Sequence, residues 1–162
     1  MVWSGYTQRT VSWKDGSIVL VDQKKLPNRL SFIECTTHSQ VVNAIKDMSV
    51  RGAPAIGAVA AMALALVAYR SKAKTKKDLI KELEVASGEL RATRPTAVNL
   101  SWALQRIMNR AHLAEGSLKD IIESVKEEAN LISEEDVKAN RAIGMYGAHL
   151  LENGDVVLTH CK

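Results

Sequence analysis

An almost unbroken apolar run from Ala53 to Tyr69 is the feature that most constrains how this chain folds. A helix that is apolar on every side is stable only at the centre of a fold, so we expect the other elements to surround it. Its length of about 17 residues lies near the lower limit for spanning a bilayer. Because the run is rich in alanine and contains Gly57, we interpret it as the buried central helix of a bundle, and we expect no membrane partner.

The residues just before this run predict an anion-binding turn. Gly52 beside Arg51 allows the backbone to turn tightly, and Pro54 suits the first position of a helix because it has no N–H to leave unpaired. A helix start attracts anions through its free N–H groups and its dipole, and a planar guanidinium suits a phosphate. Arg51, Gly52 and Ala53 are therefore candidate phosphate ligands. The turn alone leaves open an ordinary helix start with an exposed arginine.

A second turn repeats this pattern further along the chain. Arg94 is followed by Pro95, which we expect near the first position of a helix carrying Trp102 and several aliphatic residues. The preceding helix should stop at Arg94, because the residue before a proline disfavours the helical conformation. Arg94 is thus the second candidate phosphate ligand.

The N-terminal region predicts a small sheet. Asp15-Gly16 separates two β-branched runs between Thr10 and Asp22, which is a strong hairpin signal. We place Trp13 in the first strand, mainly as a packing residue. The segment from Arg29 to Cys35 alternates well enough for a third strand, in which we expect Cys35 to be buried.

The rest of the chain predicts further helices, and the fold class is therefore α+β. Capping-box signatures with an acidic or amide residue three positions on begin at Thr37, Thr75 and Ser117. The last helical region runs to about Leu151, and Ser133 offers a second start signal. One long helix and two helices with a break near Ser133 are both consistent with that pattern.

The C-terminal residues predict the start of a different domain. Asp155 to Cys161 has the pattern of a buried strand with polar, reactive residues at its end. Ligands bind beyond the carboxyl ends of strands in open α/β sheets, which makes Cys161 a candidate site residue. We divide the chain into a β subdomain (1–35), a helical bundle (36–153) and the first strand of a Rossmann-like α/β domain (154–162).

Composition and charge narrow the function classes. The 22 basic and 18 acidic side chains give a net charge of +4, and the basic run from Lys72 to Lys77 has no interleaved aromatic residues, so we expect no nucleic-acid partner. Cys35 and Cys161 are the only cysteines, and no paired Cys/His spacing predicts a metal site. We expect no metal, no cofactor and a cytoplasmic location.

Four blocks together resemble one family, and they stand in the family's order. They are Trp13-Lys14-Asp15-Gly16 continuing to Asp22-Gln23 and Leu26-Pro27; Arg51 to Gly57; Arg94 to Leu100 with Trp102; and Leu158-Thr159-His160-Cys161. With these blocks the chain closely resembles the 5-methylthioribose-1-phosphate isomerases over essentially all 162 residues. The wider family includes ribose-1,5-bisphosphate isomerases and regulatory subunits of the eukaryotic initiation-factor exchange complex.

The resemblance implies an aldose-to-ketose isomerase of methionine salvage that converts 5-methylthioribose 1-phosphate into 5-methylthioribulose 1-phosphate. It implies substrate binding by Arg51, Gly52, Ala53 and Arg94, catalysis by Cys161, and a homodimer. The family's general acid, an Asp, lies well downstream of the cysteine, and Lys162 stands where the family usually has Asn. We therefore expect the C-terminal half to come from a longer polypeptide or a second chain, and this chain alone to be inactive.

Two other functions remain open. A regulatory, initiation-factor-like subunit would need no catalysis, although such a module has no reason to keep Arg51, Arg94 and Cys161 together. An isomerase of ribose 1,5-bisphosphate would use the same turns. Pro54 after Arg-Gly-Ala and the hairpin with Trp13 favour the methylthioribose branch.

Overall fold

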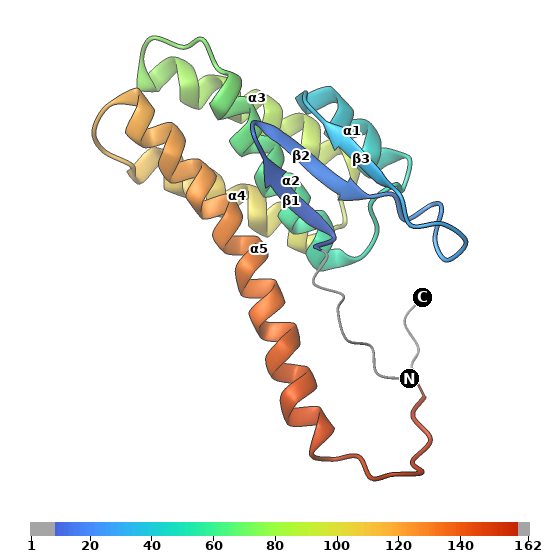
Figure 1. The fold of residues 1–162 in the computed structure, drawn as a ribbon. Helices are drawn as coiled ribbons and strands as arrows, with labels where there is room; N and C mark the ends of the chain where they lie inside the picture. Colours follow the sequence, from blue (N-terminus) through green and yellow to red (C-terminus); the bar gives the residue numbers. More distant parts are fainter. Residues whose placement is uncertain (1–8, 159–162) are drawn as a thin grey trace.

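The computed structural model describes residues 9–158. Three short strands are followed by five helices, as the α+β prediction requires. Figure 1 shows α2 in the middle, with the sheet on one side and the other helices around it. The elements are β1 (Val11–Lys14), β2 (Ser17–Val21), β3 (Phe32–Cys35), α1 (His38–Lys46), α2 (Ala53–Arg70), α3 (Lys76–Thr93), α4 (Val98–Leu113) and α5 (Leu118–Ala148).

The predicted hairpin and third strand are confirmed. The strands pair antiparallel in the order β1-β2-β3, with Lys14 opposite Ser17 across the turn. Asp15 and Gly16 have φ of 48° and 79°, the left-handed pair that a two-residue hairpin turn requires. The turn is held against the end of α2, because the Arg70 guanidinium donates to the Gly16 carbonyl at 3.0 Å.

Trp13 is a packing residue, as expected. Its ring meets that of Tyr69 edge to face, with centroids 5.6 Å apart, so the aromatic pair joins the sheet to α2. Cys35 is fully buried in β3, and this burial raises the pKa of its thiol. A buried thiol with a raised pKa is unreactive near neutral pH.

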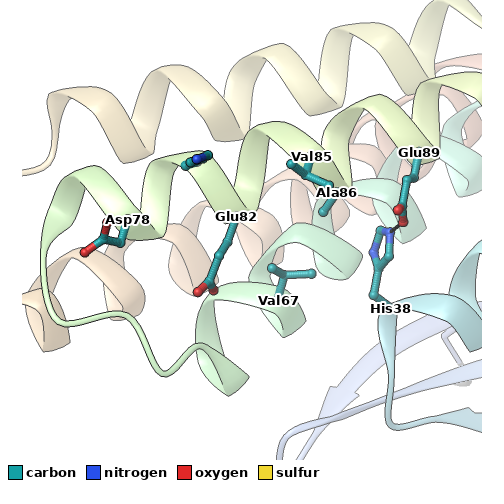
Figure 2. Close-up of a pocket in the computed structure, with 8 residues that line it drawn as sticks. His38, Val67, Asp78, Glu82, Val85, Ala86 and Glu89 are labelled. Atoms are coloured by element: carbon teal, nitrogen blue, oxygen red, sulfur yellow. Dashed lines mark hydrogen bonds and ion pairs between the residues drawn. The ribbon is translucent and has the colours of Figure 1, made fainter.

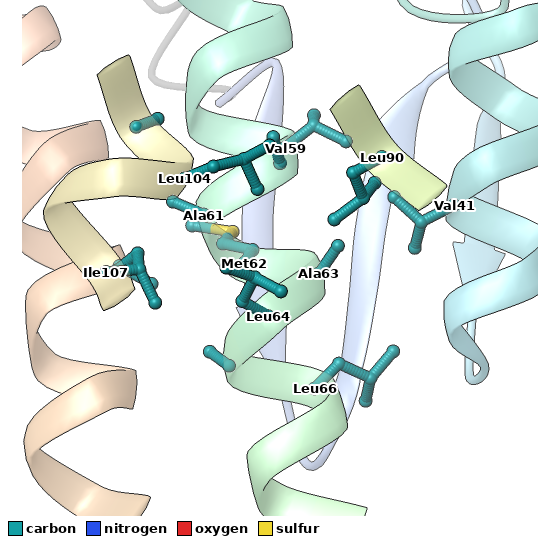
Figure 3. Close-up of a cluster of buried hydrophobic side chains, with 14 of the residues drawn as sticks. Val41, Val59, Ala61, Met62, Ala63, Leu64, Leu66, Leu90, Leu104 and Ile107 are labelled. Atoms are coloured by element: carbon teal, nitrogen blue, oxygen red, sulfur yellow. The ribbon is translucent and has the colours of Figure 1, made fainter. Parts of the chain in front are cut away.

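The predicted central helix is confirmed as α2. It is long and apolar enough to cross a membrane, yet about two thirds of it is buried inside the structure, as in the core helix of a globular protein. Figure 3 shows its alanine and leucine side chains meeting residues of α1, α3 and α4. The sheet contributes Ile18, Leu20 and Cys35 to the same hydrophobic core.

The predicted helix caps are largely confirmed. Thr37 with Gln40 and Ser117 with Asp120 form complete capping boxes. At Thr75 only half of the box is present: the Thr75 side chain accepts from the Asp78 N–H, but the hydroxyl then donates to the Asp78 carboxylate. Each cap satisfies a backbone N–H that would otherwise lack a partner.

The two alternatives for the last helical region resolve in favour of one helix, α5, with no break at Ser133. Ser133 is buried, and the two acidic residues after it form ion pairs with other parts of the chain. Glu134 pairs with Arg9 at 2.7 Å and Glu135 pairs with Arg106. These contacts hold the middle of α5 against the rest of the fold, and the helix ends at Ala148, earlier than expected.

The strand predicted at the C-terminal end is not formed over its described part, residues 155–158. Val156 and Leu158 are almost fully exposed. A single apolar segment has no stable sheet conformation without a neighbouring strand, and none pairs with it among residues 9–158. The Rossmann-like domain and the boundaries at residues 35 and 153 stay predictions.

Candidate phosphate-binding site

The turn before α2 has the open helix start that anion binding needs. Gly52 occupies the N-cap position with φ of 92°, a value that glycine adopts readily, and no side chain caps the helix. Pro54 lies in the first turn, so the N–H it lacks would have had no helical acceptor. The exposed N–H groups and the positive dipole end therefore remain available to an anion.

Arg51 is held beside this turn by the loop that follows β2. Its Nη2 donates to the Gln23 carbonyl at 2.7 Å, and the Gln23 side-chain amide donates to the Arg51 carbonyl at 3.0 Å. This exchange fixes the guanidinium near the helix start and uses one of its five N–H donors. The side chain is otherwise exposed, so the remaining donors can bind a ligand.

The turn before α4 differs in detail from the prediction. Arg94 caps the end of α3 and is half-buried, and its carbonyl accepts from the Ala97 N–H at 3.0 Å. The N-cap of α4 is Ala97, so Pro95 lies two residues before the cap and not near the first helical position. This happens because residues 94–97 close a turn of their own before the helix begins.

The two helix starts lie next to each other. A Cβ atom built on Gly57, in the first turns of α2, would be 3.0 Å from the carbonyl oxygen of Asn99 in α4. A contact this short is tighter than most Cβ contacts in proteins, so glycine suits this approach best. The turns that carry Arg51 and Arg94 therefore precede neighbouring helix N-termini, whose positive dipole ends add together at one end of the bundle.

A cavity of about 270 Å³ opens where these helix starts meet the middle of α5. The first turns of the two helices and one face of α5 line it, through Pro54, Gly57, Asn99, Trp102, Ile132, Glu135, Asp136 and Ala139. It combines apolar walls with a few polar groups, as small-molecule sites commonly do.

The aromatic wall of this cavity is held by an ion-pair network. The Arg106 guanidinium lies 5.4 Å from the centroid of the Trp102 ring and donates to Glu128 at 2.6 Å and to Glu135 at 3.0 Å. The hydrogen bond from Arg106 lowers the pKa of Glu135, so this carboxylate stays charged at neutral pH. The ion pairs hold the Arg106 guanidinium beside the half-exposed Trp102 ring, where a cation–π contact stabilises both side chains.

The sequence does not predict this cavity. Asn99 and Trp102 belong to one of the blocks that carry the family resemblance, but the sequence assigns no role in a cavity to either of them or to Asp136. A signal existed in α4, where Asn99, Trp102 and Arg106 follow helical spacing on a face separate from the buried Leu104 and Ile107. The contribution of α5 has no such local signal.

Cys161, the predicted catalytic residue, lies outside the described residues, as do Thr159, His160 and Lys162. No group of three or more His, Cys, Asp or Glu side chains able to hold a metal ion occurs within residues 9–158.

A second cavity, of about 510 Å³, lies toward the other end of α2 and is bordered by α3 (Figure 2). Val67 and several residues of α3 line it together with His38, whose Nε2 lies 2.9 Å from the Glu89 carboxylate. None of the predicted site residues borders it. Val67 is 14 positions after Ala53, about 20 Å along the helix, so this cavity is far from the two arginine turns.

Comparison with known proteins identifies the family of this chain. Residues 49–162 match the model of the initiation factor 2 subunit family, and the chain belongs to that family.

Two curated relatives show which members of the family this chain is similar to. A methylthioribose-1-phosphate isomerase of Pelotomaculum thermopropionicum is 48% identical over 94% of this chain, and one of Desulforamulus reducens is 47% identical over 94%. The chain spans only 43% and 44% of the length of these two proteins.

Two solved structures share the fold with a TM-score of 0.87 and 44% identity. One is a 5-methylthioribose 1-phosphate isomerase from Pyrococcus horikoshii OT3, covering 92% of this chain and 42% of its own. The other is described as translation initiation factor eIF-2B, subunit delta, from A. fulgidus, covering 96% of this chain and 45% of its own.

Proposed function

We propose that this chain is part of an aldose-to-ketose isomerase that converts 5-methylthioribose 1-phosphate into 5-methylthioribulose 1-phosphate. The observation that carries the proposal is the similarity to curated isomerases at up to 48% identity over 94% of the chain. The adjacent helix starts after Arg51 and Arg94 support it, because they offer the donors that a sugar phosphate needs.

In this proposal the two turns hold the phosphate on carbon 1. Arg51 and Arg94 supply guanidinium donors, and Gly52 and Ala53 supply the open helix start. A phosphate on the anomeric oxygen prevents spontaneous ring opening, so an acid must help the ring oxygen to leave before hydrogen moves from carbon 2 to carbon 1. Holding the phosphate fixes both carbons in position for that transfer.

Cys161 is the proposed catalytic residue, acting on the migrating hydrogen. The general acid is assigned to a segment beyond the 162 residues, in the same polypeptide or in a second chain. We propose further that the complete enzyme is a cytoplasmic homodimer of methionine salvage, needs no cofactor or metal, and has no nucleic-acid or membrane partner.

The decisive test is an assay of the complete polypeptide with 5-methylthioribose 1-phosphate. Arg51→Ala should weaken substrate binding by about tenfold to a hundredfold, because a charge-assisted hydrogen bond is worth about 1.5–3 kcal/mol. Cys161→Ser should lower kcat with little change in binding. Activity indifferent to Cys161→Ser would remove the thiol from the mechanism.

A regulatory subunit without catalysis is the second candidate. It is supported by the likeness of fold to a solved structure that is described as an initiation factor subunit. Failure of the complete wild-type polypeptide to turn over any ribose 1-phosphate would support this reading against the isomerase.

A further inference from the structure

One residue of the loop after β2 directs all of its polar groups at the turn that carries Arg51. The Gln23 N–H donates to the Ser49 carbonyl at 3.0 Å. The Gln23 side-chain amide donates to the Arg51 carbonyl at 3.0 Å, and the Gln23 carbonyl accepts from Arg51 Nη2 at 2.7 Å. The backbone and the side chain of Gln23 therefore hold both the main chain and the guanidinium of Arg51.

The loop that presents Gln23 is itself fixed by a buried carboxylate. The Asp22 side chain is 5% exposed, pairs with Lys25 at 3.2 Å and accepts from the Lys24 N–H at 3.2 Å. The Asp22 N–H donates to the carbonyl of Ser31, just before β3, at 2.9 Å. These bonds join the loop to the sheet, so Gln23 is presented from a fixed support.

The turn that carries Arg51 needs such a support. Met48 has φ of 63° and Gly52 has φ of 92°, so left-handed residues lie on both sides of Arg51. A residue such as Met48 keeps this conformation only where its surroundings impose it. Val50 is 1% exposed and anchors the turn in the core, but Arg51 lies beyond this anchor and is exposed. Among residues 9–158, its carbonyl accepts only from the Gln23 amide.

This support leaves the charge of Arg51 available. Arg51 forms no ion pair within residues 9–158. Asp47, the acidic residue of the same turn, is occupied by Lys24 Nζ at 2.6 Å and by the Ser49 N–H at 2.9 Å. A carbonyl holds a guanidinium without cancelling its charge, whereas a carboxylate would form an ion pair with it. The positive charge therefore remains for a phosphate.

We propose that Gln23 is a positioning residue of the phosphate site. Its side-chain amide fixes the main chain of Arg51, and the guanidinium is thereby kept beside the start of α2 with its charge intact. Gln23 acts through Arg51 and not by contact with the substrate. The inference rests on the proposed function, because Arg51 must be a phosphate ligand for its position to matter.

The test measures the affinity of the complete polypeptide for 5-methylthioribose 1-phosphate by calorimetry. Gln23→Met has a similar length but no N–H donor, and it should weaken binding by about fivefold. Gln23→Glu should weaken binding by about twentyfold or more, because its carboxylate cannot donate to the Arg51 carbonyl and competes with the phosphate for the guanidinium. Circular dichroism confirms that each variant is folded.

A double-mutant cycle separates positioning from general support of the fold. In an Arg51→Ala background the carbonyl of residue 51 is still present, but the guanidinium is gone. Gln23→Met should then change the affinity by less than about twofold. Gln105→Met is the matched control, because it makes the same substitution at an exposed glutamine of α4 whose amide donates to Asn109 at 2.8 Å. It should leave the affinity unchanged.

The outcomes distinguish this inference from the proposed function. If Arg51→Ala weakens binding and Gln23→Met does not, the positioning role is wrong and the phosphate site stands. An equal loss from Gln23→Met with and without Arg51 would show that Gln23 supports the fold generally, which also overturns the inference. If wild type does not bind 5-methylthioribose 1-phosphate, both the proposed function and the inference fail.

Discussion

The two halves of α5 have similar helical patterns and opposite surroundings. In the first half Ile121, Val125 and Ala129 are at most 2% exposed and pack into the bundle. In the second half Ile143 and Tyr146, at comparable helical spacing, are each 69% exposed, and Figure 1 shows this part of the helix extending beyond the other helices. Periodicity therefore indicates which face of a helix is able to be buried, whereas the neighbouring elements determine whether it is buried.

Truncating the buried half should have the largest effect. Ile121→Ala should lower the free energy of unfolding by about 2–5 kcal/mol, because it removes buried methyl groups and leaves a cavity between α5 and its neighbours. Urea unfolding followed by circular dichroism measures this loss. A loss below about 1 kcal/mol would mean that the first half of α5 is not packed as described.

Removing the N-cap of α5 should have a smaller effect. Ser117→Ala should cost about 1 kcal/mol, because the side-chain oxygen no longer accepts from the Asp120 N–H. The same urea experiment measures it, with Ser117→Asp as the control that retains a capping oxygen. If both variants lose the same stability, the cap is not the cause.

The ion pairs of Glu134 and Glu135 in the middle of α5 should make the free energy of unfolding depend on pH in the acidic range. Hydrogen bonds from Arg9 and Arg106 lower the pKa values of Glu134 and Glu135 in the folded chain. The unfolded chain then binds more protons, so this stabilisation is present above the ordinary glutamate pKa near 4.5 and is lost as the pH falls below it. Unfolding midpoints between pH 6 and about 3 measure the loss, which should be smaller in the Glu134→Gln, Glu135→Gln double variant. An identical pH profile for the double variant would contradict these ion pairs.

The smallest effect is expected in the exposed half. Ile143→Ala should change the free energy of unfolding by no more than about 0.5 kcal/mol, because most of the side chain is already exposed to solvent. It is the matched control for Ile121→Ala, with the same substitution in the same helix. A loss above about 1 kcal/mol would show that this face is covered in solution, and analytical ultracentrifugation would then show whether a second copy covers it.

The elements that local chemistry determines could be predicted from the sequence. The hairpin at Asp15-Gly16, the capping boxes at Thr37 and Ser117 and the burial of α2 depend on residues a few positions apart. The strand predicted to start at Asp155 is not formed over residues 155–158, because a strand needs a partner that residues 9–158 do not provide.

Part of the candidate site could also be predicted from local sequence, and part of it could not. Arg51 and Arg94 could be selected because each carries its own helix start in the neighbouring residues. The cavity could not, because Trp102 and Asp136 meet only when α4 and α5 cross the start of α2. Cys161 and the roles of the arginines remain predictions.

The close approach at Gly57 limits how such a site can be redesigned. Because a Cβ at position 57 would lie only 3.0 Å from the Asn99 carbonyl oxygen, the two helix starts are already in close contact and cannot come nearer to each other. A binding site adapted to a larger or differently charged ligand would then keep its anion-holding end and change the α5 side. Residues 132–139 are therefore where protein engineering should introduce diversity.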